Sequence, residues 1–264
     1  MLRNVFTKWL WDARRSVLVW TLAIVVVGGG YAAFWPTINT PGIQEALESY
    51  PQGLREALNY DDLSTASGYL TASVYGLIVA LLLVVYAVSA GTRIIAGDEE
   101  ASTLDLILAH PVSRIQLALQ RFASFVLSVV IIVSVFWLGM LALIVPAQLD
   151  DISTGQFAAM HVHLVLFTSF FGAVTYATGA ATGRKSFAIG IGSGVGVLGY
   201  FAQGIIPQLE GLEWVENLSP FHWLIGGDPL RNGLQVGDCL LMLGLVGAVV
   251  MWGSWAFSRR DIAV

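Results

Sequence analysis

Few side chains in this sequence have types and spacings that suit chemistry, and the candidate for nucleotide binding does not fit its motif. Gly183-Arg184-Lys185-Ser186 ends like a phosphate-binding loop. That loop has the spacing G-x-x-x-x-G-K-[ST] and follows a strand, whereas here an arginine precedes the lysine and long apolar runs lie on both sides. We interpret these four residues as a basic turn between two membrane helices. We therefore expect no ATPase site on this chain.

Intramembrane proteolysis is the main enzymatic alternative. Glu99-Glu100 resembles the paired glutamates of CaaX-protease-like enzymes, but Leu104 stands in the region where those enzymes have an arginine. Ser193 lies in the sequence GIGSGVGVLG and resembles a rhomboid-like serine. Its glycine spacing differs, and the sixth apolar segment has no histidine to act as a base. We expect no catalytic residue.

The histidines and the cysteine do not predict a metal site. His161 and His163 are two residues apart, so they point to different sides of a helix and we expect both at the membrane interface. Cys239 is the only cysteine, which excludes an internal disulfide and, with four scattered histidines, argues against structural zinc. We expect no metal, no cofactor and no nucleic-acid partner.

The composition is that of a membrane protein. Of 264 residues, 56% are hydrophobic and 12% are charged, whereas soluble domains carry about 25% charged residues. We predict an all-α polytopic membrane protein with one transmembrane domain, residues 1–264. Six apolar segments are long enough to cross a hydrocarbon core of about 30 Å. They are residues 16–35, 72–95, 117–145, 158–182, 187–206 and 239–257.

The N-terminal segment, residues 1–15, is mixed in character. Its apolar residues, among them Val5 and Trp9, share one helical face. This pattern predicts an interfacial helix lying flat on the membrane, and the alternative is a disordered basic flank. A cleaved signal peptide is the alternative for residues 16–35, but no small-x-small cleavage site precedes Pro36.

The distribution of charge predicts the orientation. Eleven of the 13 Lys and Arg residues lie in the N-terminal segment, the region 93–121, the turn 184–185 or the C-terminal tail. In contrast, 12 of the 18 acids lie in three loops that begin at residues 36, 146 and 207. Basic residues stay on the cytoplasmic side. We predict a multi-pass cell-membrane protein with both termini in the cytoplasm, and one or two short helices in the first of these loops.

One predicted cytoplasmic segment, residues 97–114, reads GDEEASTLDLILAHPVSR. An acidic cluster, Asp98-Glu99-Glu100, opens it, and acids stabilise a helix N-terminus. Leu104, Ile107 and Leu108 then follow at helical spacing, which makes one apolar stripe. The predicted helix is too short to span a bilayer. We expect it to present its surface to an aqueous partner.

The boundaries of this helix and two alternatives follow from the same residues. Asp98 or Ser102 is expected to cap its N-terminus, and Pro111 to end it before Arg114 begins the next helix. The acidic cluster could instead be a solvated turn. The apolar stripe could instead lie on the lipid surface.

The interiors of the spans carry few polar groups. Spans three to six have no charged residue near their centres, which argues against an ion-driven transporter and against a channel. Their hydroxyls suit an amphipathic cargo or ordinary helix contacts: Thr168, Ser169, Thr175, Tyr176 and Thr178. Glycines of the fifth span allow close helix packing, either within the protein or on a sliding face: Gly190, Gly192, Gly194, Gly196 and Gly199.

The segment GDEEASTLDLILAHPVSRIQLALQRF resembles the pattern E-E-x-x-x-T-L-[D/E]-x-[L/I]-L-x-x-P-[V/I]-[S/T]-R of permease subunits in type-2 ABC exporters. The order of surface helix, six spans and acidic segment matches as well. SPFHWL at Ser219–Leu224, GDPLRNGL at Gly227–Leu234 and the closing RRD are similar to actinobacterial drug or polyketide exporter permeases. The resemblance covers essentially the whole chain.

The resemblance implies that the segment between spans two and three is a coupling helix that docks on a separate cytosolic ATPase. The positions that match the family pattern are Glu99, Glu100, Thr103, Leu104, Leu108, Pro111 and Arg114. The family's N-terminal surface helix also contacts the ATPase, which makes Lys8, Trp9, Arg14 and Arg15 second-tier candidates. Ser102 departs from the glycine that relatives often have before the Thr-Leu pair.

The implied working unit contains two permease halves, identical or paralogous, and two ATPase subunits that bind ATP and Mg. It would export an amphipathic or hydrophobic substrate, such as a drug, an antibiotic or a lipid-like molecule, through membrane lipid. The alternative from another class is a non-transporting membrane scaffold or regulatory subunit.

Overall fold

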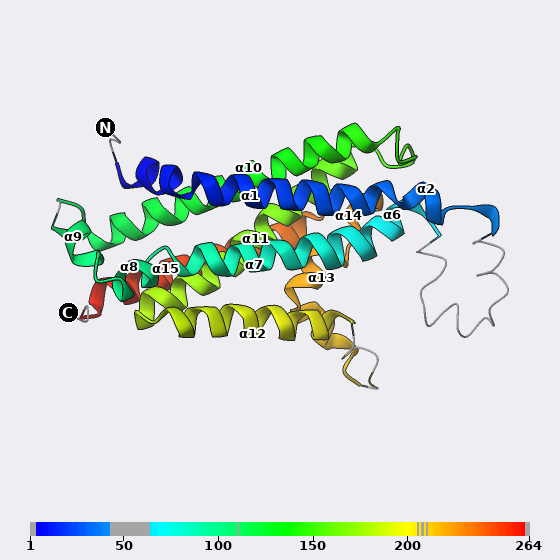
Figure 1. Ribbon diagram of the computed structural model, residues 1–264. Coiled ribbons are helices and arrows are strands. Elements are labelled where there is room, and N and C mark those ends of the chain that lie inside the picture. The colour runs from blue at the N-terminus through cyan, green and yellow to red at the C-terminus, as the bar shows by residue number, and fades with distance from the viewer. Residues whose placement is uncertain are drawn as a thin grey trace.

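The computed structural model describes residues 4–42, 64–109, 111–204, 206, 209 and 211–261. These residues form a bundle of long helices and contain no strand. Six of the helices are long and apolar enough to cross a membrane (Figure 1). The all-α prediction is confirmed. The short helices expected in the loop after residue 36 fall largely on residues outside those described.

Each predicted span corresponds to helical structure, and the bounds differ by a few residues except at the start of the first span, where α1 begins at Val5 and not at residue 16. The spans are α1 (Val5–Ala33) followed by α2 (Trp35–Ile38); α6 (Ala66–Tyr69), the π-helix η1 (Leu70–Val79) and α7 (Ala80–Thr92); α10 (Arg114–Leu143); α11 (Thr154–Thr182); α12 (Lys185–Gly204); and α15 (Val236–Arg259). The shorter elements are α8 (Ala96–Glu100), α9 (Leu104–Leu108), the 3-10 helix η3 (Glu213–Leu218), α13 (Pro220–Ile225) and α14 (Pro229–Asn232).

The N-terminal segment does not form a separate surface helix, which corrects the prediction. α1 begins after Asn4, whose side chain accepts a hydrogen bond from the Thr7 N–H at 2.9 Å, and continues into the span without a break. No glycine or proline occurs in α1 before Gly28, so nothing in the sequence interrupts the helix. The Ser124 hydroxyl donates to the Phe6 carbonyl at 2.9 Å and fastens the first turns to α10.

The central helix is α11, which packs against α7, α10, α12 and α15. Its two histidines are buried among neighbouring helices and do not lie on the surface of the bundle. They face different neighbours, as predicted: Nδ1 of His161 is 2.7 Å from the Phe157 carbonyl oxygen, and Nδ1 of His163 is 3.0 Å from that of Trp223. Both are therefore part of the core.

The two ends of the bundle differ in what they carry. α1 begins and α15 ends at one end, and α8 and α9 lie there as well (Figure 1). α2, α6 and α14 lie at the opposite end (Figure 1). The fold thus brings the acidic cluster close to the C-terminal end of α15.

Candidate functional site

The segment 97–114 contains two short helices, not the single helix that its pattern predicts. α8 ends at Glu100, and α9 begins at Leu104 after a turn in which Ser102 has a φ of 53°. A residue with a side chain rarely adopts this left-handed conformation, whereas glycine does so without cost. The positive φ explains why a glycine would fit at position 102, where the family pattern often has one. The Thr103 N–H and hydroxyl both donate to the Asp98 carbonyl, at 2.9 and 3.1 Å, and close the turn.

Neither predicted capping residue caps a helix. α8 begins after Ile95 with no side-chain cap, and Asp98 lies in its first turn. A carboxylate in the first turn still interacts favourably with the helix dipole. α9 ends at Leu108, before Pro111, and α10 begins at Arg114, as predicted.

The first residue of the acidic cluster binds α10. Asp98 Oδ2 lies 2.6 Å from Nη2 of Arg121, whose side chain is 7% exposed. The Arg121 Nη1 also donates to the Ile94 carbonyl at 2.7 Å. This buried arginine therefore joins α10 to Ile94, just after α7, and to Asp98 in α8.

The other two residues of the cluster bind α15 and α12. Glu99 accepts two hydrogen bonds from the Arg260 guanidinium, from Nη1 at 2.7 Å and from Nη2 at 2.5 Å, just after the end of α15. Glu100 Oε1 accepts from the backbone N–H of Lys185, the first residue of α12, at 2.7 Å. A carboxylate at a helix N-terminus satisfies an unpaired donor and the helix dipole together. The acidic cluster thus connects α8 to three spans.

The turn between α11 and α12 leaves no room for a side chain beside this cluster. Gly183 ends α11 with a φ of 69°. A Cβ there would lie 2.5 Å from Glu99 Oε1 and 2.5 Å from Arg260 Nη1. Arg260 Nε also donates to the Ala180 carbonyl at 3.2 Å, and Arg114 Nη1 donates to the Arg260 carbonyl at 2.5 Å. The position of Gly183 therefore requires glycine for both conformation and space.

The predicted partner-contact residues divide into inward and outward groups. Leu104 is 1% exposed, and Ile107 and Leu108 pack partly against the core. Within the stripe, Leu104 is therefore turned into the protein's own core, whereas Ile107 and Leu108 keep part of their surface exposed. Glu99 is also buried, and Arg114 is half-buried. The exposed residues of the segment are Glu100, Ala101, Ser102, Thr103, Ala109, Pro111 and Ser113.

The second-tier candidates lie on the first turns of α1, at the same end of the bundle (Figure 1). Lys8, Arg14 and Arg15 are exposed, whereas Trp9 is half-buried against the core. Lys8 Nζ lies 3.5 Å from Asp12 Oδ2 in an exposed pair. The Arg14 guanidinium lies over the ring of Trp11, 4.2 Å from its centroid.

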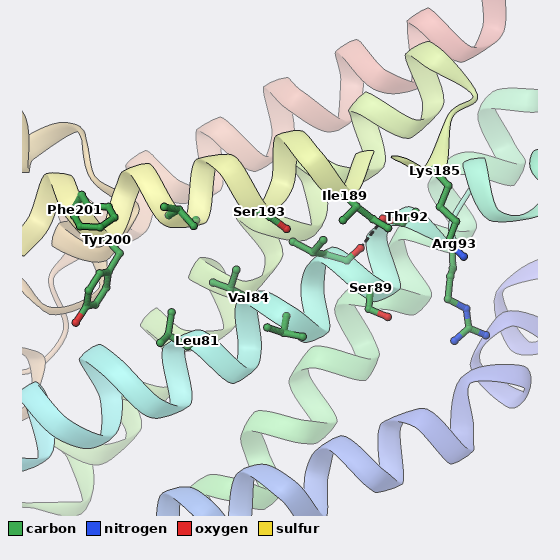
Figure 2. Close-up of a pocket in the computed structure, with 14 residues that line it drawn as sticks. Leu81, Val84, Ser89, Thr92, Arg93, Lys185, Ile189, Ser193, Tyr200 and Phe201 are labelled. Carbon is green, nitrogen blue, oxygen red and sulfur yellow. Dashed lines mark hydrogen bonds between the residues drawn. The ribbon is translucent and has the colours of Figure 1, made fainter. Parts of the chain in front are cut away.

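A groove of about 640 Å³ lies between α7 and α12 (Figure 2). Its lining includes Ser89, Thr92 and Ser193, and among the described residues it contains no carboxylate or histidine. Figure 2 shows Ser89 and Thr92 near one end, with two cationic side chains, Arg93 and Lys185. The candidate nucleophile Ser193 therefore has no general base within the groove.

The hydroxyls of the groove are not those that the sequence singled out for cargo. Four of the predicted hydroxyls donate to carbonyls four residues earlier in α11: Thr168, Ser169, Thr175 and Thr178. Tyr176 pairs with Ser254 of α15 at 2.7 Å. The first four therefore bond within α11 itself, and only Tyr176 joins two helices. The signal that was missed is the spacing of Leu81, Val85, Val88, Ser89 and Thr92, which places them on one face of span two.

The glycines of the fifth span also divide into two sets. Cβ atoms would lie 2.4 Å from Thr175 Oγ1 at Gly192 and 3.1 Å from Val84 Cγ1 at Gly196, so this face packs within the protein. A Cβ at Gly190 or Gly194 would meet nothing within 4 Å. Close packing inside the chain is therefore confirmed for one face of α12 only.

Six membrane-length helices, and a two-helix segment bound to three of them, define a polytopic membrane protein whose short segment between spans two and three is fastened to the ends of other spans. The family model described as "ABC-2 family transporter protein" matches residues 3–262, and the chain belongs to this family. A comparison with curated proteins finds no match. Family membership makes the chain the membrane permease subunit of an ABC transporter. It is a transport subunit, not a catalytic one, and the family implies an ABC ATPase partner.

Proposed function

We propose that this permease couples hydrolysis of ATP by a separate cytosolic ATPase to the export of an amphipathic or hydrophobic substrate, such as a drug, an antibiotic or a lipid-like molecule. ATP and Mg bind to the partner. The observation that carries the proposal is the acidic cluster, which ties α8 to α10, α12 and α15. A motor that displaces this segment displaces the ends of three spans together.

The ATPase docks on the exposed face of the segment rather than on its apolar stripe. This face includes Ser102, Thr103 and Pro111, and the exposed cations of the first turns of α1 lie at the same end. Leu104 and Glu99 act indirectly, because both are buried and hold the segment on the bundle. The basic residues at this end are cytoplasmic by the positive-inside rule, which puts both termini in the cytoplasm.

A second permease half, identical or paralogous, completes the path through the lipid. The outward face of α12 supports this arrangement, since Gly190 and Gly194 leave space for a neighbouring helix backbone. The similarity to drug and polyketide exporter permeases supports outward transport.

The test is co-purification of the ATPase with the tagged full-length chain from its own cells. Thr103→Arg places a bulky charge on the exposed face and is expected to reduce the recovered ATPase about tenfold, which corresponds to about 1.4 kcal/mol of binding. Thr37→Arg is the matched control, because Thr37 is exposed on α2 at the opposite end.

Both variants are first checked for wild-type melting temperature. If the Thr103→Arg chain retains its ATPase and its ATP-dependent transport, the docking assignment is wrong. If the chain binds an ATPase and moves no cargo, it is a scaffold or regulatory subunit.

A further inference from the structure

We propose that the groove between α7 and α12 binds an amphiphile with one apolar tail and one anionic head group. This inference rests on the proposed function and names the substrate class of that transporter. The head group binds at the cytoplasmic end of the groove, beside Arg93 and Lys185, and the tail lies along the apolar walls toward Tyr200 and Phe201 (Figure 2).

The walls of the groove suit a hydrocarbon chain. From Leu81 to Arg93 the groove follows α7 for about 18 Å, which is more than half of a hydrocarbon core of about 30 Å. Val85 and Val197, from opposite walls, are 55% and 56% exposed at the bundle surface. A ligand can therefore enter sideways from the membrane. The volume of the groove, about 640 Å³, lies in the range of small-molecule sites.

The charges at the cytoplasmic end select an anion. Arg93 and Lys185 are both exposed, and neither forms an ion pair with another residue in the part of the chain that the structure describes. The nearby carboxylate of Glu100 binds the backbone N–H of Lys185, not its ammonium. Among the residues that the structure describes, none that lines the groove is acidic. Two cations close together attract an anionic head group and repel a cationic one.

The hydrogen bond between the Lys185 backbone N–H and Glu100 connects the head-group site to the segment 97–114. Lys185 supplies a cation to the groove, and its backbone N–H is held by Glu100 of the acidic cluster. Binding of an anion beside Lys185 therefore acts on the first turn of α12, the turn that Glu100 caps. The residue that binds the head group is therefore in direct contact with the segment on which the ATPase acts.

The experiment measures equilibrium binding of two probes to the purified full-length chain in nanodiscs of phosphatidylcholine. The probes are a fluorescent 16-carbon fatty acid and its amine-headed counterpart. The wild-type chain is expected to bind the carboxylate at least about tenfold more tightly than the amine, since hydrogen bonds between two charged groups are stronger than those between neutral groups. Arg93→Gln combined with Lys185→Gln is expected to remove this preference. Arg184→Gln is the matched control, because Arg184 is exposed in the same turn and does not line the groove.

A second pair of variants tests the position of the tail. Ser193→Trp fills the groove and is expected to abolish binding of the carboxylate probe, whereas Leu198→Trp lies on exposed surface outside the groove and leaves it unchanged. Equal affinity for the two probes, or binding unaffected by Ser193→Trp, overturns the proposal. If phosphatidylglycerol displaces the fatty acid at equal concentration, the occupant is a two-tailed membrane lipid and the single-tail assignment is wrong.

Binding in this assay requires no ATPase, so its failure is separate from failure of the proposed function. If the wild-type chain shows no preference for the carboxylate probe but still co-purifies with its ATPase, the assignment of the substrate class is wrong and the proposed coupling stands. If the wild-type chain prefers the carboxylate probe but recruits no ATPase, the proposed coupling is wrong and the anion-binding groove stands.

Discussion

The pair formed by Glu99 and Arg260 gives the sharpest quantitative test of how the segment is held. We expect Glu99→Gln to destabilise the folded chain strongly, although glutamine has nearly the same shape as glutamate. The substitution leaves the guanidinium of Arg260 without a counterion at a site where the Glu99 side chain is 5% exposed. The segment would then keep its backbone contacts but lose its two-bond attachment to the end of α15.

The magnitude follows from the burial of the two groups. Removing one partner of a buried ion pair costs about 3–5 kcal/mol, because the remaining charge is left uncompensated. The Arg260 side chain is 20% exposed and retains some contact with water. We therefore expect the lower end of this range, about 3 kcal/mol. The coupling energy between the two residues should be about 2 kcal/mol, within the range measured for residues in contact.

The assay is reversible unfolding of the full-length chain in mixed micelles, for the wild type, Glu99→Gln, Arg260→Gln and the double variant. The control is Lys8→Gln, which breaks an exposed pair with side chains 65% and 57% exposed and is expected to cost less than about 0.5 kcal/mol. If Glu99→Gln costs no more than this control, or if the two single effects are additive, the ion pair does not hold the segment.

Three further predictions use the same unfolding assay or a labelling assay. Gly183→Ala should lower the free energy of unfolding by about 2 kcal/mol or more, because φ is 69° and the new Cβ would lie 2.5 Å from atoms of the Glu99–Arg260 ion pair. Gly190→Ala is the control, because a Cβ there meets nothing within 4 Å, and it should change the free energy of unfolding by less than about 1 kcal/mol. Gly192→Val should reduce the folded yield, since its Cβ would lie 2.4 Å from a threonine oxygen, whereas Gly194→Val should not; equal yields would contradict this packing. Ser102→Cys in a cysteine-free chain should react with a membrane-impermeant maleimide only after the cells are permeabilised, and labelling of intact cells would reverse the predicted topology.

The six spans could be predicted because the signal for a membrane helix is local. Each span is a continuous run whose length and hydropathy are set by neighbouring residues. Most boundaries shifted by a few residues, although α1 begins well before the predicted first span. The start of α10 at Arg114 was predicted, and in the structure Ser113 caps it, since its side chain accepts from the Gln116 N–H at 3.2 Å. Long helices therefore follow from sequence.

The internal structure of the segment 97–114 was not predictable in the same way. Its acids and apolar stripe favour one helix, yet the chain turns at Ser102, a residue with no intrinsic preference for a positive φ. The turn is held by the Asp98 carbonyl and by burial of Leu104. Contacts with the rest of the bundle overrode the local helical pattern.

The sequence alone determined that the chain crosses a membrane six times, that its basic residues gather in the same set of connecting segments, and that an acidic cluster lies between spans two and three. Only the tertiary structure decided what that cluster binds. Its partners Arg121, Lys185 and Arg260 lie on α10, on α12 and just after the end of α15, and Arg260 is 161 residues from Glu99 along the chain. The physical reason is that hydropathy and helix periodicity act between near neighbours, whereas an ion pair depends on which helix ends the packing of the bundle brings together.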